Sequence, residues 1–77
     1  MEELLAEMKK AIEDAIPNSV AQVDGSGGHF VIDVVSKEFE GKRILAQHRM
    51  VMSSIAHLMK GDNAPVHAID KLVCKVS

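Results

Sequence analysis

Seventy-seven residues suffice for one small domain, so we treat residues 1–77 as a single domain. Hydrophobic residues make up 47% of the chain, yet it has no Trp or Tyr and two Phe, so its core must be largely aliphatic. The net charge of −2 disfavours a general polyanion binder, and a lone cysteine excludes an intramolecular disulfide. No apolar run is long enough to cross a membrane, and we expect a soluble, cytoplasmic protein.

The first predicted element is a helix over residues 2–16, which Pro17 ends. Its apolar side chains recur at helical spacing: Leu4, Leu5, Met8, Ala11, Ile12, Ala15 and Ile16. A β-hairpin follows, with strands predicted over residues 19–25 and 29–36 because both are short and rich in β-branched residues. The glycine-rich stretch between them is longer than a two-residue turn, so we expect its tip to be mobile.

A second helix is predicted over residues 43–59, after a polar turn around Gly41. One stripe of its surface carries Ile44, Leu45, His48, Val51, Met52, Ile55, Leu58 and Met59. The pattern leaves open whether this helix breaks near its middle. A third strand is predicted over residues 66–76, where Lys71 interrupts the apolar pattern and suggests a twist or bulge.

The order helix, strand, strand, helix, strand predicts a two-layer α+β domain with both helices on one face of a three-stranded sheet. The second helix is about as long as a strand, so it returns the chain to the end where the second strand began. The third strand should then run parallel to the second. His29 and His67 would lie at that shared end, adjacent if the strands are neighbours and about 10 Å apart if another strand intervenes.

Spacing alone does not make these histidines a metal site, since most histidines are structural or simply exposed. The chain has no CxxC and no HExxH pattern that would indicate a closed zinc site. Two imidazoles cannot complete a tetrahedral site. If His29 and His67 bind metal, the remaining ligands must come from a partner.

A set of short motifs resembles the BolA family. In chain order they are Ser36, the turn Phe39-Glu40-Gly41-Lys42, the pair His48-Arg49, and the segment Val66-His67-Ala68-Ile69. The stretch ending in His29 also resembles the family's glycine-rich loop, in the version with histidine where others have cysteine. The resemblance implies a class II KH-like fold of order α-β-β-α(-α)-β, with a three-stranded mixed sheet and the helices on one face.

The resemblance further implies a monothiol glutaredoxin as partner, sharing a [2Fe–2S] cluster for iron–sulfur delivery or iron regulation. His67 and, less securely, His29 would be the metal ligands on this side. The glutaredoxin cysteine and a glutathione thiol would be the others. Imidazole is a suitable iron ligand near neutral pH. The isolated chain is then expected to hold no cofactor, and to be a monomer or weak homodimer.

An alternative of another class is a KH-like nucleic-acid-binding transcriptional regulator. Lys42, Arg43 and Arg49 are the candidate partner or nucleic-acid surface, although three cations near a turn are more often a solvated face. The negative net charge and scarcity of aromatic residues limit this alternative to weak DNA binding.

Two further residues are assigned structural roles. His48 lies on the apolar stripe of the second helix, which favours half-buried packing over ligation. Cys74 comes late in the third strand, and no general base accompanies it, so we expect a buried, inert thiol. Without a nucleophile, acid–base pair or phosphate loop, the chain is not expected to be an enzyme.

Overall fold

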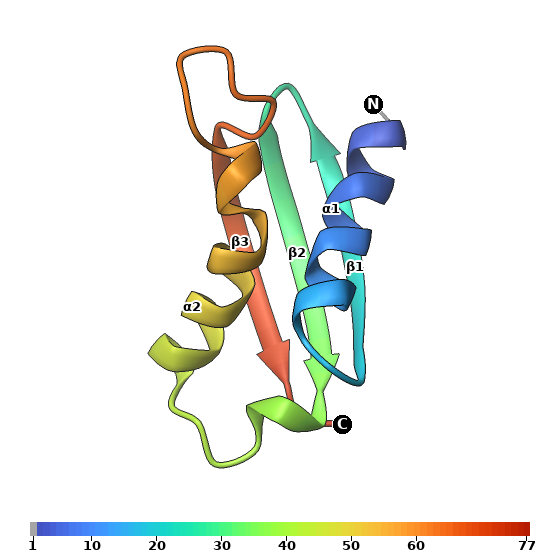
Figure 1. The fold of residues 1–77 in the computed structure, drawn as a ribbon, viewed down its shortest axis with the longest axis vertical. Coiled ribbons are helices and arrows are strands. Elements are labelled where there is room, and N and C mark those ends of the chain that lie inside the picture. The colour runs from blue at the N-terminus through green and yellow to red at the C-terminus, as the bar shows by residue number, and fades with distance from the viewer. Residues whose placement is uncertain (1) are drawn as a thin grey trace.

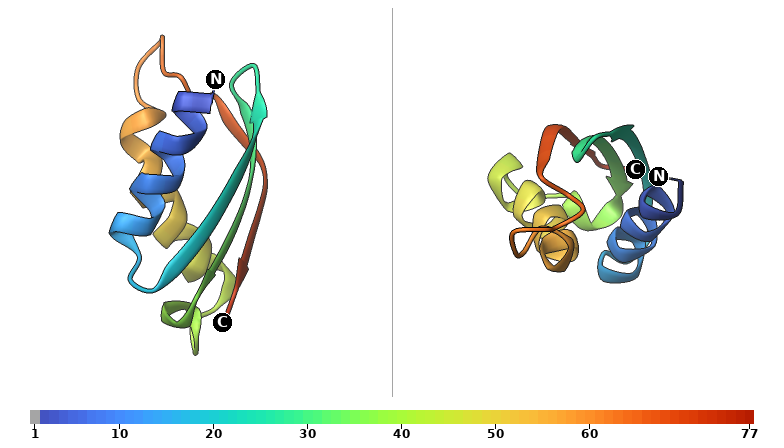
Figure 2. Two further views of the ribbon diagram at one scale, coloured as in Figure 1. Left: turned by 90° about the vertical axis from the view of Figure 1, so that its right-hand side faces the viewer. Right: turned by 90° about the horizontal axis from the view of Figure 1, so that it is seen from above.

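The computed structural model describes residues 2–77 as two helices packed on one face of a three-stranded sheet (Figures 1 and 2). This confirms the predicted two-layer α+β fold. The elements are α1 (Glu2–Ala15), β1 (Ser19–Ser26), β2 (His29–Ser36), the 3₁₀ turn η1 (Lys37–Phe39), α2 (Ile44–Ile55), the 3₁₀ turn η2 (Ala56–Leu58) and β3 (Ala68–Lys75). Within residues 2–77, neither helix has the length and hydropathy of a membrane span.

The sheet has the order β1-β2-β3, with β2 in the centre. β1 pairs antiparallel with β2, and β2 pairs parallel with β3, as predicted from the element lengths. α2 follows β2 and precedes β3 in the chain and runs back along the sheet (Figure 1), so both parallel strands begin at the same end. The alternative with a strand between β2 and β3 is excluded.

The core lies between the helices and one face of the sheet. β2 shows this most clearly, because Phe30, Ile32 and Val34 are buried while the alternating residues His29, Val31 and Asp33 are exposed on the open face. The buried apolar cluster comprises Met8, Ile12, Ile16, Ala21, Phe30, Ile32, Val34, Phe39, Val51, Ile55, Leu58 and Val66. The expected aliphatic core is therefore present, with both phenylalanines inside it.

The predicted apolar stripe of the second helix is wrong at its start. Ile44 and Leu45 are 70% and 63% exposed, whereas Gln47 is buried. The Gln47 side-chain amide donates hydrogen bonds to the carbonyls of Phe39 and Lys42, both at 3.0 Å. The buried face of α2 therefore begins at Gln47, whose side-chain amide holds the preceding turn. Residues 44–46, which come before it in the helix, are exposed.

The second helix also ends earlier than the predicted residue 59. The α-helical part stops at Ile55 and continues as η2, so the break left open by the pattern lies near the end of the predicted range. Ile55 itself has left the helical region, with φ −115° and ψ 7°.

The hairpin between β1 and β2 is tighter than predicted. β1 continues to Ser26, and the turn consists of Gly27 and Gly28 alone. Both have positive φ, 64° and 83°, as the two central residues of a type I′ turn require. The expectation of a loop longer than two residues was wrong, because Gly25 and Ser26 pair with Phe30 and His29.

Candidate metal centre at the start of the parallel strands

His29 and His67 lie side by side at the end of the sheet where β2 and β3 begin. His29 is the first residue of β2, and its partner in the parallel ladder is Ala68, the residue after His67. Neighbouring strands are about 4.8 Å apart. Both histidines are exposed. The juxtaposition predicted from topology is therefore present: both residues are exposed at the end of the sheet where β2 and β3 begin.

Gly28, in the turn between β1 and β2, holds both the backbone and the ring of His67. The carbonyl oxygen of Gly28 accepts hydrogen bonds from the backbone N–H groups of His67, at 2.9 Å, and Ala68, at 3.0 Å. The His67 ring lies against Gly28 so closely that a Cβ there would overlap ring atom Cδ2. Gly28 thus serves two needs, a positive φ and room for the imidazole.

The structure corrects the expected difference between the two histidines. His67 is not the second residue of a strand, because β3 begins at Ala68. His29, in turn, does not end a long loop, since it pairs with Ser26 on one side and Ala68 on the other. Ordering a loop is therefore no greater cost for His29 than for His67, and both backbones are held by hydrogen-bonded neighbours.

Asp70 is a neighbour of this site that the sequence analysis did not single out. Its Oδ1 lies 3.1 Å from Nδ1 of His29. The available signal was a pair of charged residues, Asp70 and Lys71, in a largely apolar strand, with Asp70 three positions after His67. Only the register of β3 against β2 shows that it meets His29.

The basic residues lie elsewhere. Lys42 and Arg43 immediately precede α2, which starts at the end of the sheet where β2 finishes, opposite the histidines (Figure 1). Arg49 is on α2, and all three are exposed. Lys42 and Arg43 therefore lie at the other end of the sheet from the histidine pair.

His48 and Cys74 lie where the sequence placed them. His48 is half-buried on α2. Cys74 is half-buried on β3, packs against the core, and burial raises the pKa of its thiol. A raised pKa lowers the thiolate fraction, which makes this cysteine a weak nucleophile and a weak metal ligand at neutral pH.

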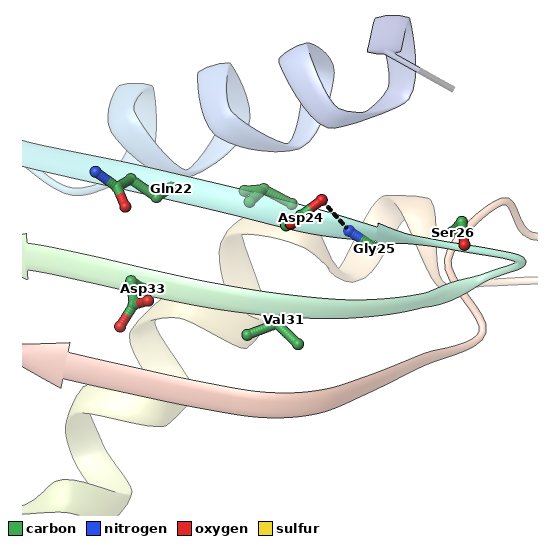
Figure 3. Close-up of a pocket in the computed structure, with 7 residues that line it drawn as sticks. Gln22, Asp24, Gly25, Ser26, Val31 and Asp33 are labelled. Atoms are coloured by element: carbon green, nitrogen blue, oxygen red, sulfur yellow. Dashed lines mark hydrogen bonds between the residues drawn. The ribbon is translucent and has the colours of Figure 1, made fainter.

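The open face of the sheet carries a shallow hollow beside the hairpin, drawn in Figure 3. Its lining comes from β1 and β2 and consists of Gln22, Val23, Asp24, Gly25, Ser26, Val31 and Asp33. Two of these are carboxylates and none is a cation. The hollow is therefore electrostatically unsuited to a phosphate backbone.

Residues 2–77 bring no three His, Cys, Asp or Glu side chains together as a metal site. A metal at His29 and His67 would therefore need further donors supplied from outside this chain. Two neutral imidazoles are suitable iron donors, as the His₂ half of a Rieske cluster illustrates. The donor set thus fits half of the terminal ligands of a [2Fe–2S] cluster.

Together, the α-β-β-α-β order and the mixed sheet define a class of small KH-like α+β domain, here with two exposed histidines where the parallel strands begin. The model of the BolA-like protein family matches residues 2–74. The chain belongs to the BolA-like family.

Individual relatives support this assignment. The chain is 44% identical to Protein BOLA2 of Arabidopsis thaliana over 45 residues, 58% of this chain and 44% of that protein. It is 50% identical to a putative bolA-like protein of Caenorhabditis elegans over 32 residues, 42% of this chain and 30% of that protein. The matched segments thus span less than half the length of these curated relatives.

Solved structures of the family share the fold. A bolA protein homologue from Coxiella burnetii superposes with a TM-score of 0.75 at 29% identity, covering 92% of this chain and 87% of that one. BolA1 from Arabidopsis thaliana superposes with a TM-score of 0.76 at 22% identity, covering 94% and 89% of the two chains.

Proposed function

We propose that this protein pairs with a monothiol glutaredoxin and shares a [2Fe–2S] cluster with it, as cargo for iron–sulfur delivery or as a signal in iron regulation. The observation that carries the proposal is the position of His29 and His67, exposed and adjacent at the start of two hydrogen-bonded parallel strands. His67 and His29 would supply two imidazole ligands. The partner's cysteine and a glutathione thiol would supply the other two.

The contribution of this chain is to hold the two histidine ligands in an ordered backbone before the metal binds. The two backbones are already ordered by the sheet and the Gly28 carbonyl, so binding requires little further loss of backbone entropy. Both side chains remain exposed, so a partner can reach them. Imidazole in place of thiolate also raises the reduction potential of a cluster, which suits a cluster that is held and then released.

Reconstitution tests this proposal. The chain, a monothiol glutaredoxin, glutathione, iron and sulfide are mixed anaerobically, and absorption is followed with size analysis. We expect a heterodimer with visible absorption for the wild type. Failure to form any coloured heterodimer would reject the proposal.

Variants of the histidines test the ligand assignment in the same assay. His67→Ala and His29→Ala should each remove or strongly labilise the heterodimeric cluster. His29→Cys should restore one with a more thiolate-like spectrum, since the family resemblance includes both residue types at that position. His48→Gln is the matched control, because it removes a half-buried imidazole on α2 and should leave the spectrum unchanged. An unchanged spectrum for His67→Ala, with loss for His48→Gln, would show that the wrong ligand was assigned.

A further inference from the structure

The neighbourhood of His29 contains a carboxylate that the two-histidine site does not explain. Asp70 on β3 lies 41 residues further along the chain, yet its Oδ1 is 3.1 Å from Nδ1 of His29. The two side chains are 60% and 56% exposed. An exposed contact of this kind contributes little to folding stability. Its effect is therefore sought in what it does to the His29 ring.

A bulge in β3 places the carboxylate. Phe30 pairs with Ile69, but the next residue of β2, Val31, pairs with Lys71, so Asp70 is the extra residue without a partner. Asp70 and Lys71 are accordingly both exposed, in a strand where regular alternation would turn one of them inward. Bulges re-aim side chains next to functional sites. Here the bulge leaves Asp70 on the open face, beside His29.

The contact determines which imidazole nitrogen is free. An ionised carboxylate has only acceptor atoms, so a hydrogen bond to Asp70 requires the proton to be on Nδ1 of His29. The neutral ring then has its lone pair on Nε2. Histidines that bind metals commonly donate their second N–H to a carboxylate, which fixes the tautomer and the ring orientation.

We propose that Asp70 is a positioning residue for His29: the bulge in β3 holds its carboxylate on Nδ1, so that Nε2 is presented as the metal-binding atom. This inference rests on the proposed function for its biological meaning. The tautomer of His29 can be measured without any metal, so the two ideas can fail separately.

The first measurement uses the apo protein. Long-range ¹H–¹⁵N correlation of the histidine rings, at a pH above about 8 where free imidazole is neutral, reports the tautomer of each ring. The His29 signal is identified by its absence in His29→Gln. We expect the Nδ1–H tautomer in the wild type and in Asp70→Asn, whose amide oxygen still accepts. In Asp70→Ala the Nδ1–H form should lose its dominance.

Asp33→Ala is the matched control, because it removes the same charge from the same face of the sheet on the strand that carries His29. It should leave the His29 tautomer as in the wild type. A wild-type His29 with its proton on Nε2, or a tautomer unchanged by Asp70→Ala, would overturn the proposal whether or not a cluster forms.

The second measurement is the rate at which a chelator removes iron from the reconstituted heterodimer. Loss of a partner behind a metal ligand commonly weakens metal binding by about 10–100-fold. We expect Asp70→Ala to lose iron about tenfold faster than wild type, and Asp70→Asn and Asp33→Ala to stay near the wild-type rate. Equal rates for Asp70→Ala and Asp33→Ala would show that the His29–Asp70 contact does not serve metal binding.

Discussion

At the scale of single residues, the position of the His67 ring depends on Gly28 having no side chain. Its φ of +83° is costly for any residue with a Cβ, and the added atom would overlap the His67 ring. Gly27 has a similar φ of +64° but open space around the position of a Cβ. Alanine at Gly27 would therefore introduce backbone strain alone, and alanine at Gly28 would introduce the same strain together with a steric overlap.

We predict that Gly28→Ala and Gly27→Ala both lower the free energy of unfolding, by about 1–2 kcal/mol from the left-handed backbone alone. Only Gly28→Ala should also move the His67 ring and labilise the shared cluster. Urea unfolding measures the first effect, and the NMR chemical shifts of the His67 ring with the reconstitution assay measure the second. Equal cluster yields from the two variants would contradict the role given to Gly28.

Gln47 is a second residue whose part is visible only in three dimensions. Its amide joins the carbonyls of Phe39 and Lys42 in the turn before α2. Gln47→Ala should lower the free energy of unfolding by about 1–3 kcal/mol, because it removes two hydrogen bonds worth about 0.5–1.5 kcal/mol each. Gln22→Ala, on the exposed face of β1, should change stability by less than about 0.5 kcal/mol. Comparable losses for the two variants would argue against a structural role for Gln47.

At the scale of elements, side chains of α1 cover the free edge of β1 at Ala21. Lys9 Nζ donates to the Ala21 carbonyl at 2.7 Å, the Ala21 N–H donates to Glu13 Oε2 at 2.9 Å, and Lys9 pairs with Glu13 at 2.6 Å. Both backbone groups of an edge residue are thus satisfied, which protects the strand from pairing with another chain.

This arrangement predicts a pH dependence of stability. The Ala21 N–H, followed by Lys9, holds the pKa of Glu13 below its ordinary value of 4.5. A lowered folded-state pKa means that the unfolded chain binds more protons in this range, so the contribution of Glu13 is present above pH 4.5 and is lost as the pH falls through the folded-state value. Thermal unfolding from pH 7 to 3 should show a smaller acid-induced loss for Glu13→Gln than for the wild type. Asp14→Asn, at an exposed pair with Lys10, is the control. An acid response of Glu13→Gln equal to that of the wild type would show that Glu13 does not carry the effect.

The spacing of apolar residues along the sequence predicted an element well where the spacing alone determined its structure. α1 has a clear helical period and a proline at its end, and β2 alternates between core and solvent. The errors arose where longer-range contacts decided the outcome. Residues 26–28 were assigned to the loop, but the ladder extended through Ser26. In α2, Gln47 is buried by its hydrogen bonds to the preceding turn, whereas Ile44 and Leu45 are exposed.

In the candidate site, too, some residues could be placed from the sequence and others only from contacts distant in the chain. Element lengths and strand direction were enough to bring His29 and His67 to one end of the sheet. Asp70 could not be found in this way, because its place depends on a one-residue register shift between Phe30 and Val31. Lys71 hinted at an irregularity in β3 but did not identify which side chain it would redirect.

At the scale of the whole molecule, the two ends of the sheet differ in chemistry. The histidines lie where β2 and β3 start, and Lys42 and Arg43 lie beyond the end of β2, before α2 (Figure 1). Charge changes at the basic end should therefore affect electrostatic steering of a partner without altering metal ligation.

We accordingly expect Lys42→Ala with Arg49→Ala to leave the cluster spectrum unchanged and to slow association with the glutaredoxin most at low salt. The control pair Lys71→Ala and Lys75→Ala removes the same charge from β3. Isolated protein should show weak, strongly salt-dependent DNA binding at most. Tight sequence-specific DNA binding at physiological salt, abolished by the first pair, would favour the regulator alternative.

The parallel pairing of β2 and β3 also sets when during folding the histidines can meet. The β1–β2 hairpin is local in sequence and can form early, but it presents His29 alone. His67 arrives only after α2 has folded back and β3 has docked beside β2, a long-range step that is intrinsically slow. The His29–His67 pair therefore exists only once the domain is complete. If the proposed function holds, metal binding by the histidine pair would therefore require a folded domain.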